Sequence, residues 1–286
     1  MKIKIGTRKS RLAMAQTKMV SDALLEKYPS VQIEIVPVTT KGDVVTDRPL
    51  SAIGGKGIFV NEIESALQIG KIDIAVHSAK DLPAKLGNSL EISGVLGRGN
   101  YRDVLVSSPK TSFDVNSEFI VGTGSLRRRN NLLRIFPNVQ FRDIRGNVDT
   151  RLRKMESGDF DAVVLAAAGL ERLEIDLEKY STVFFDYNSF LPAPCQGIIA
   201  VESRKNDFVT PFIKSISHRD SFLCFETERK VIELSGGDCS TPLGAYSCIK
   251  GEKIYLTVSL DSKKVVSDSA EISKRFQLAE ELISRL

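Results

Sequence analysis

The chain has 286 residues, of which 42% are apolar and 27% are charged. This composition is typical of a folded globular protein and excludes a mostly disordered chain, and the length indicates two or three domains. The 40 Lys and Arg residues exceed the 36 Asp and Glu residues by only four, so the net charge gives no reason to expect nucleic acid as a partner.

Signals for a membrane, for export and for a metal site are missing from the sequence. The longest apolar stretch, 162–170, is about half of what a bilayer span requires. Residues 1–9 contain no apolar signal core and run directly into a structural pattern, so we expect an untrimmed cytoplasmic protein that does not bind membranes. The four cysteines show no CxxC spacing, which indicates a reducing compartment, and two histidines are too few for a His-rich metal site.

The chain contains the same pattern twice. In each copy a short strand ends in Gly-Thr and a helix follows; a second strand, a loop, another helix and a third strand come next. The corresponding segments are strands 2–5 and 119–121, helices 10–26 and 125–136, segments 24–32 and 132–140, and segments 70–76 and 158–164. Alternating strands and helices predict a parallel sheet covered by helices in each copy, hence two similar α/β lobes in tandem.

The two Gly-Thr turns lie where α/β proteins bind anions. Ligands sit beyond the carboxyl ends of the strands, and backbone N–H groups at a helix N-terminus attract negative charge. A plain turn with a helix N-cap is the alternative for either turn alone. Two such turns at equivalent places favour an anion-binding cleft between the lobes.

The pattern changes after the proline cluster at 191–194. From there on, the expected elements are a buried strand at 197–202, a helix at 221–234, strands at 244–249 and 253–260, and a final helix at 270–286. The expected domains are an α/β lobe 1 at 1–98, completed by about 197–216, an α/β lobe 2 at 99–196, and a small α+β domain at 217–286.

Basic charge is concentrated between Ser125 and Lys154. Nine Lys and Arg residues, eight of them Arg, stand against Asp143 and Asp149, so nine minus two gives a local charge of +7. Arginine binds carboxylate or phosphate through two parallel hydrogen bonds. Because several of these arginines lie at turns, we expect a small polyanion as ligand rather than a solvated helix face. RNA is the competing partner, but interleaved aromatics and Gly-rich RNA motifs are absent.

Polar residues also follow the buried strand of the first copy. Ser78, Lys80 and Asp81 place a hydroxyl, a cation and a carboxylate at the carboxyl end of that strand. An Asp in a dry cleft beside a Lys can move a proton or stabilise a cation, and a capping or salt-bridging Asp is the alternative. His77 alone fits a packed or hydrogen-bonded structural histidine.

Two loops could take part in the chemistry. The glycine-rich segment 51–59 is not a P-loop, because Gly57 follows Lys56, and it could be a flap over the cleft or an ordinary loop. Cys239 lies in a glycine-rich turn, where a thiol is available for covalent chemistry. The other cysteines lie in or beside apolar segments and are expected in the core.

Six segments along nearly the whole chain resemble the porphobilinogen deaminase (hydroxymethylbilane synthase) family. No single motif is decisive, but six in register are highly specific. In the family's order they are Gly6-Thr7-Arg8-Lys9-Ser10, Gly54-Gly55-Lys56-Gly57, Ala75-Val76-His77-Ser78-Ala79-Lys80-Asp81, Gly122-Thr123-Gly124-Ser125-Leu126-Arg127-Arg128, Arg145-Gly146-Asn147-Val148-Asp149-Thr150-Arg151 and Leu191-Pro192-Ala193-Pro194-Cys195-Gln196-Gly197.

The resemblance implies a transferase of porphyrin, tetrapyrrole and haem biosynthesis. Its members join four porphobilinogen molecules head to tail into hydroxymethylbilane and release ammonia at each addition. The chain grows on a dipyrromethane cofactor held by a thioether to a loop cysteine. The resemblance also implies two lobes like those of type II periplasmic binding proteins around a cleft, with the small α+β domain after them. The expected partner is porphobilinogen alone, with no nucleic acid, membrane or metal, and the expected state is a monomer.

The resemblance also implies roles for individual residues. The thioether would form at Cys239, Lys56 would belong to the flap loop, and Asp81 would be catalytic, helping to expel the amine and stabilising the positively charged azafulvene and pyrrole intermediates. The implied cofactor-binding residues are Cys239, Ser78, Lys80, Asp81, Thr123, Ser125, Arg127 and Arg128. The implied substrate-binding residues are Arg8, Ser10, Arg145, Arg151 and Arg172.

Two positions depart from the family's usual pattern. Asp238 stands directly before Cys239, where the family usually has a small residue, and a carboxylate there could raise the thiol pKa or crowd the cofactor. Gly124 stands where the family usually has a hydroxyl residue, although Arg127 and Arg128 are in place.

Two other classes of function stay open at this point. A non-catalytic anion-binding module with the same two-lobed architecture would leave Cys239 without a role, so an unmodified cysteine would favour it. A phosphoribosyltransferase would need a pyrophosphate-binding loop and metal-linked acidic residues, for which the sequence offers no clear candidate.

Overall fold

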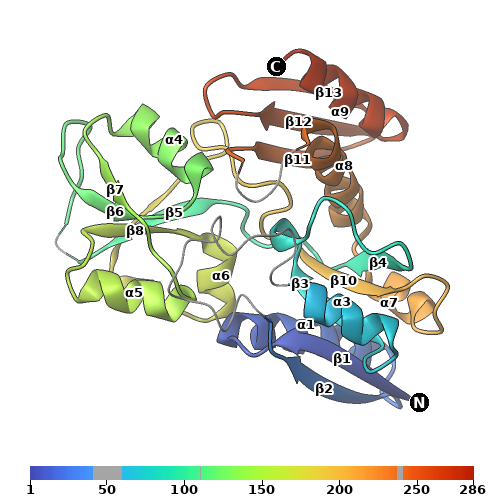
Figure 1. The fold of residues 1–286 in the computed structure, drawn as a ribbon. Helices are drawn as coiled ribbons and strands as arrows, with labels where there is room; N and C mark the ends of the chain where they lie inside the picture. Colours follow the sequence, from blue (N-terminus) through green and yellow to red (C-terminus); the bar gives the residue numbers. More distant parts are fainter. Residues whose placement is uncertain (41–59, 110, 237–240) are drawn as a thin grey trace. The chain divides into compact units, whose positions relative to one another are not determined.

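The computed structural model describes residues 1–40, 60–109, 111–236 and 241–286 (Figure 1). By their internal contacts these residues form two compact units. Unit 1 comprises Met1–Gly99 and Ile198–Glu226, and unit 2 comprises Asn100–Gly197 and Thr227–Leu286. Within the described ranges, no helix is long and apolar enough to cross a membrane.

Unit 1 is built on a mixed five-stranded sheet with the order β2-β1-β3-β10-β4. Its strands are β1 (Lys2–Arg8), β2 (Gln32–Val38), β3 (Ile74–Ser78), β4 (Leu90–Val95) and β10 (Ile199–Arg204). β1 pairs in parallel with β2 and β3, as the alternation of strands and helices predicts. β10 lies antiparallel between β3 and β4.

Helices cover both faces of the unit 1 sheet. They are α1 (Arg11–Lys27), α3 (Asn61–Gln68) and α7 (Thr210–Ile216). On one face Leu24 of α1 and Ile213 of α7 share a core with Ile74. On the other face Leu67 of α3 shares a core with Ala75. Because neighbouring residues of a strand point to opposite faces, both faces of β3 are covered, and the strand is buried up to its last residue, Ser78, which is partly exposed.

Unit 2 repeats this architecture with the strand order β7-β6-β8-β5-β9. Its strands are β5 (Asp103–Ser107), β6 (Ile120–Gly122), β7 (Gln140–Arg142), β8 (Ala162–Ala166) and β9 (Ser181–Phe184). β6 pairs in parallel with β7 and β8, and β5 lies antiparallel between β8 and β9. The two sheets therefore have the same order and the same strand directions, which confirms the repeat and the α/β fold class.

The helices of this sheet also occupy two faces. They are α4 (Leu126–Ile135), α5 (Val148–Glu156) and α6 (Ala167–Arg172). Leu132 of α4 shares a core with Val164, whereas Leu152 of α5 and Leu170 of α6 share a core with Val163 on the opposite face. The expectation of a parallel sheet is wrong at β5 and β10, which lie antiparallel to their neighbours. Each of these strands follows a point where the chain passes from one unit to the other, so neither belongs to a βαβ crossover.

The C-terminal part of unit 2 is a three-stranded antiparallel sheet with helices. Its elements are β11 (Gly244–Lys250), β12 (Lys253–Ser259), β13 (Val266–Glu271) and α9 (Arg275–Ser284). α8 (Arg219–Ser235) begins in unit 1 and ends in unit 2. The predicted helix at 270–286 is wrong at its start, because 270–271 complete β13, a polar edge strand with no apolar alternation. The division into three domains stays a prediction.

Candidate active site

Five of the predicted site residues lie at one edge of the unit 1 sheet. β1 and β3 are parallel neighbours, so their carboxyl ends share that edge. Arg8 is the last residue of β1 and Ser10 is the N-cap of α1. Ser78 ends β3, and Lys80 and Asp81 lie in the 3₁₀ turn that follows it. This edge therefore carries two cations, two hydroxyls and a carboxylate.

The turn after β3 presents Asp81 to solvent. Gln16 on α1 holds Ser78 in place through two hydrogen bonds. Gln16 Nε2 donates to Ser78 Oγ at 2.8 Å, and Ser78 Oγ donates to Gln16 Oε1 at 3.1 Å. Leu82, directly after Asp81, is buried and fixes the turn on the core. The Asp81 side chain is exposed and Lys80 is half-buried. A rigid turn thus carries an accessible carboxylate.

Negative charge is buried behind this edge. His77 Nε2 and Glu202 Oε2 are 2.9 Å apart, with His77 7% exposed and Glu202 fully buried. The interpretation of His77 as a hydrogen-bonded structural histidine is confirmed. Glu202 Oε1 is buried and has no hydrogen-bond partner among the residues that the structure describes. Burial, and then the charge of Glu202, raise the pKa of the carboxyl of Glu64 on α3. The interior of unit 1 therefore favours positive charge nearby.

The Gly-Thr turn of unit 2 uses its hydroxyls to begin a helix. Ser125 is the N-cap of α4 and its side chain accepts from the Arg128 amide at 3.4 Å. Thr123 is buried, its amide donates to the Arg142 carbonyl at 3.0 Å, and its Oγ1 accepts from the Ser125 amide at 3.2 Å. Ser10 caps α1 in the same way in unit 1. Both turns therefore contain the N-cap that was the alternative interpretation.

Arg127 and Arg128 both bind Asp103, the first residue of β5. Arg127 Nη1 donates to Asp103 Oδ2 at 2.8 Å and to the Leu191 carbonyl at 2.7 Å. Arg128 donates to Asp103 Oδ1 from Nε at 3.0 Å and from Nη2 at 2.7 Å, and its Nη1 donates to the Val164 carbonyl at 2.8 Å. Asp103 was missed in the sequence analysis, although an isolated acid at the start of an apolar strand is a usable signal.

The positive charge of Arg127 and Arg128 exceeds the negative charge of Asp103, to which both are bonded. Among the described residues, the ion pairs of this cluster join two guanidinium groups to one carboxylate, so two minus one leaves a charge of +1, with all three side chains less than a tenth exposed. Burial lowers the pKa of Arg127, which is a sign that its charge is poorly compensated. A buried cationic excess is stabilised by a ligand carboxylate. The predicted cofactor arginines therefore fit an anionic group, and Asp103 holds them in place.

The three predicted substrate arginines of unit 2 lie on separate segments. Arg145 Nη2 is buried and, within the described residues, has no hydrogen-bond partner. Arg151 Nε donates to the Gly146 carbonyl at 2.8 Å. Arg172 Nη2 donates to the Gly197 carbonyl at 2.5 Å, and burial lowers the pKa of Arg172 to about 10. Within the described residues, Arg145 thus keeps one buried N–H donor without a partner, and Arg172 is bonded to a neutral carbonyl.

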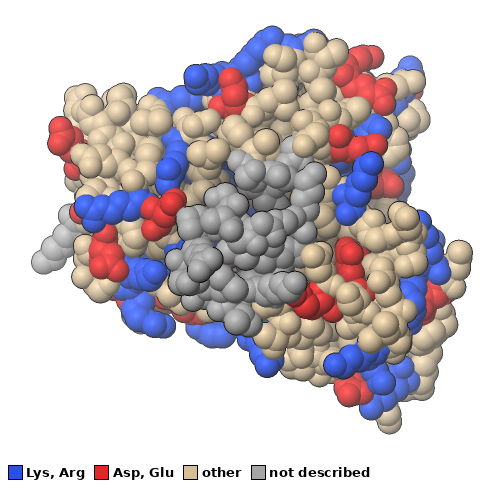
Figure 2. All heavy atoms as spheres, viewed as in Figure 1, with Lys and Arg blue, Asp and Glu red and all other residues tan. Residues whose placement is uncertain are grey.

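Other members of the basic cluster serve the structure. Arg129 Nη2 pairs with Asp143 Oδ1 at 2.6 Å, and Arg134 Nη1 donates to the Ser262 carbonyl at 2.9 Å. On the face drawn in Figure 2, Lys and Arg are intermixed with Asp and Glu. Exposed pairs of this kind contribute little to stability in water.

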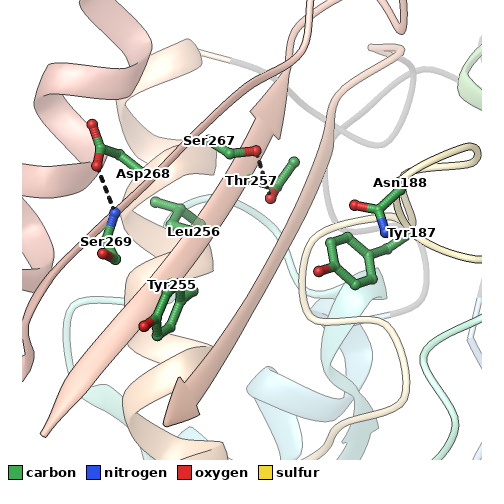
Figure 3. Close-up of a pocket in the computed structure, with 8 residues that line it drawn as sticks. All are labelled: Tyr187, Asn188, Tyr255, Leu256, Thr257, Ser267, Asp268 and Ser269. Carbon is green, nitrogen blue, oxygen red and sulfur yellow. Dashed lines mark hydrogen bonds between the residues drawn. The ribbon is translucent and has the colours of Figure 1, made fainter.

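A cavity of about 310 Å³ lies elsewhere in unit 2, against the C-terminal sheet (Figure 3). Thr257 and Ser267 are bonded to one another at 2.9 Å on its wall, and Tyr187 and Asn188 approach it from a separate segment. Its lining residues are Tyr187, Asn188, Tyr255, Leu256, Thr257, Ser267, Asp268 and Ser269. None of these is a predicted site residue, so this cavity is separate from the site.

Lys56, Asp238 and Cys239 lie outside the described residues, so the flap and the attachment cysteine stay predictions. In the sequence, Cys239 falls between the end of α8 and the start of β11. Of the remaining cysteines, Cys195 and Cys224 are buried, as expected of core residues. Cys248 on β11 is only partly buried, so the expectation of a core position is wrong there.

Comparison with known proteins assigns the chain to a family. Residues 3–210 match the sequence model described as "Porphobilinogen deaminase, dipyromethane cofactor binding domain". The chain is 41% identical over 291 residues to porphobilinogen deaminase of Roseiflexus castenholzii, covering 98% of this chain and 95% of that protein. It is 42% identical to porphobilinogen deaminase of Acetivibrio thermocellus, with 90% and 87% covered. It is 38% identical to the probable porphobilinogen deaminase of Picrophilus torridus, with 96% of each covered. The chain belongs to the porphobilinogen deaminase family.

Proposed function

We propose that this protein joins four porphobilinogen molecules head to tail into hydroxymethylbilane, releasing ammonia at each addition, as a transferase of tetrapyrrole and haem biosynthesis. The observation that carries the proposal is the buried cationic excess of Arg127 and Arg128 on Asp103. Each pyrrole of the substrate and product carries an acetate and a propionate, so a cargo of this kind requires arginines that are rigid and short of counter-charge.

The dipyrromethane cofactor fits the residues present. When bound, through a thioether to Cys239, it supplies the pyrrole carbon to which the first substrate is joined and keeps the growing chain attached. Arg127 and Arg128 would hold its carboxylates from unit 2, helped by the hydroxyls of Thr123 and Ser125. The side chains proposed to hold it from unit 1 are Ser78, Lys80 and Asp81.

Asp81 is the proposed catalytic residue. Its exposed carboxylate can accept a hydrogen bond from the aminomethyl nitrogen of porphobilinogen and assist the proton transfer that lets ammonia leave. The same negative charge stabilises the positive charge that develops on the pyrrole in that step. Buried Glu202 adds negative charge to the same unit, and Lys80 would bind a neighbouring carboxylate.

The remaining arginines are proposed to bind the substrate and the growing chain. Arg8 and Ser10 contribute from unit 1, and Arg145, Arg151 and Arg172 contribute from unit 2. A hydrogen bond to a charged group is worth about 1.5–3 kcal/mol, so a few such contacts hold each pyrrole. The proposed flap would carry Lys56. The proposed state is a cytoplasmic monomer with lobes at 1–98 and 99–196 and a cofactor-carrying domain at 217–286.

The intact mass of the acid-denatured protein, with peptide mapping, tests this function. The expected result is a covalent addition equal to one dipyrromethane on Cys239, followed by further pyrrole additions on incubation with porphobilinogen. Arg128→Leu should remain at the mass of the bare polypeptide, because the cofactor cannot be held while it is assembled. A wild-type chain that gains no mass with porphobilinogen would exclude the proposal and favour a non-catalytic anion-binding module.

A further inference from the structure

Glu228 on α8 is a fully buried carboxylate that the proposed chemistry does not use. It accepts hydrogen bonds from the Cys195 amide to Oε2 at 2.5 Å, and from the amide and hydroxyl of Ser247 to Oε1, each at 2.7 Å. A buried carboxylate is tolerated only when donors surround it in this way. One side chain therefore joins α8, β11 and the loop at 192–197.

The loop that Glu228 holds has an unusual backbone. Cys195 has φ of +62°, which is uncommon for a residue other than glycine, and Gly197 has φ of +87°. Such a conformation persists when the surroundings impose it. The bond from the Cys195 amide to Glu228 is one restraint, and the bond from Gln196 Nε2 to the Tyr101 carbonyl at 2.7 Å is another.

The same loop ends at the carbonyl that orients Arg172. Gly197 follows Cys195 by two residues, and its carbonyl oxygen accepts from Arg172 Nη2 at 2.5 Å. Arg172 is largely buried at the end of α6 and the pKa of its guanidinium is lowered to about 10 by that burial. A guanidinium has five N–H donors in a fixed plane, so the bond to Gly197 restrains its orientation and leaves capacity for a carboxylate.

We propose that Glu228 is a positioning residue: through the Cys195 amide and the Gly197 carbonyl, it holds Arg172 in the orientation that binds a substrate carboxylate. The inference rests on the proposed function, in which Arg172 binds porphobilinogen or the growing chain. Glu228 acts through the backbone of the loop and has no role in proton transfer.

Glu228→Gln keeps the size of the side chain but not its hydrogen-bonding capacity. Whichever way the amide is turned, its NH₂ group faces an N–H donor, at Cys195 or at Ser247. We expect KM for porphobilinogen to rise about tenfold, kcat to change less than about twofold, and the holoprotein mass to stay the same. A purely structural role would lower Tm and the yield of active enzyme without changing KM.

A second substitution tests whether the effect passes through Arg172. In an Arg172→Gln background, Glu228→Gln should produce no further rise in KM, since the group that it positions is gone. An equal rise in both backgrounds would overturn the proposal, as would a normal KM in the single variant. Glu233→Gln is the matched control, because Glu233 lies on the same helix, is exposed and pairs with the neighbouring Lys230 at 3.4 Å. This variant should leave KM unchanged.

Ser247→Ala covers the case in which Glu228→Gln does not fold. It removes the hydroxyl donor to Glu228 and keeps both amide donors. We expect a smaller rise in KM that also disappears in the Arg172→Gln background, and an unchanged KM would overturn the proposal. Failure of the proposed function is distinct from these outcomes, because wild-type protein would then show neither the mass addition nor turnover.

Discussion

In each five-stranded sheet, the antiparallel strand next to the edge carries a fully buried acid, and the two acids have partners of different charge. In unit 2, Asp103 on β5 faces two arginines and leaves a cationic excess. In unit 1, Glu202 on β10 pairs with one histidine, His77, and the carboxyl of Glu64 interacts with the charge of Glu202. The same architecture thus places a buried pair of arginines in the interior of unit 2 and buried carboxylate in the interior of unit 1. A reaction that binds carboxylates while it expels an amine needs both.

The residues that follow the third strand also differ between the two copies: they are polar and charged in the first copy and apolar in the second. The first copy ends with Ser78-Ala79-Lys80-Asp81, where the second has Ala166-Ala167-Ala168-Gly169. The second copy instead places its charges on α4, as Arg127 and Arg128. A duplicated fold has therefore kept its backbone and divided the proposed chemistry between its halves.

Asp81→Ala should have the largest effect, because it removes the proposed catalytic carboxylate from unit 1. We expect turnover to fall on the order of 10²–10⁴-fold, the range typical of general acid–base groups. Holoprotein mass and Tm should stay close to those of wild type, since the side chain is exposed. Steady-state kinetics with porphobilinogen measures this, and Asp159→Ala, at an exposed position of the second copy, is the control. Near-normal turnover would contradict the assignment.

Asp103→Asn should have the next largest effect, because it leaves two buried arginines without a counter-charge. Removing one partner of a buried ion pair costs about 3–5 kcal/mol of unfolding free energy. Denaturant unfolding of the holoprotein measures this loss. Asp143→Asn, which breaks the exposed pair with Arg129, should cost less than about 1 kcal/mol. Equal losses of unfolding free energy in the two variants would show that burial of Arg127 and Arg128 does not determine the cost of removing their counter-charge.

The sequence predicts the repeated elements well because their signals are local. The Gly-Thr turns, the helices that begin at Ser10 and Ser125 and the apolar third strands follow from neighbouring residues. The buried ion-pair partners do not follow from neighbouring residues. Asp103 lies 25 residues from Arg128, and Glu202 lies 125 residues from His77. These pairs form only because β5 and β10 insert between other strands, and no local pattern encodes that order.

The C-terminal strand shows the same limitation. β13 pairs with β12 through residues such as Asp268 and Ser267, which carry no apolar alternation. Its polar side chains are tolerated because it is an edge strand with one side open to water. The position of Arg172 against Gly197 was likewise beyond a local pattern, because it depends on the backbone of the loop at 192–197.

The two helix caps allow a direct comparison of the copies. Ser10→Ala and Ser125→Ala should each lower the unfolding free energy by about 1 kcal/mol, because each serine accepts a backbone N–H of its helix. Their effects on activity should differ: Ser125→Ala should slow cofactor loading, and Ser10→Ala should raise KM. Unfolding curves and mass-resolved loading measure the two effects. A loss of loading in the Ser10 variant would break the proposed division between the units.

Glu64→Gln should have the smallest effect, and it should raise the stability of the folded protein, whereas Asp103→Asn and the two serine substitutions lower it. Because burial and Glu202 raise the pKa of Glu64, the folded protein binds a proton there more tightly than the unfolded chain does. The stability from this carboxyl is therefore complete below its ordinary pKa of 4.5 and is lost as the pH rises through the folded value. The amide cannot ionise, so Tm at neutral pH should rise by about 1–3 °C and the stability should depend less on pH above 4.5. Glu118→Gln, at an exposed position of unit 2, should change neither quantity. If Tm at neutral pH instead falls, the ionised carboxylate of Glu64 is stabilised by a partner. The difference in buried charge between units 1 and 2 is then smaller than the structure indicates.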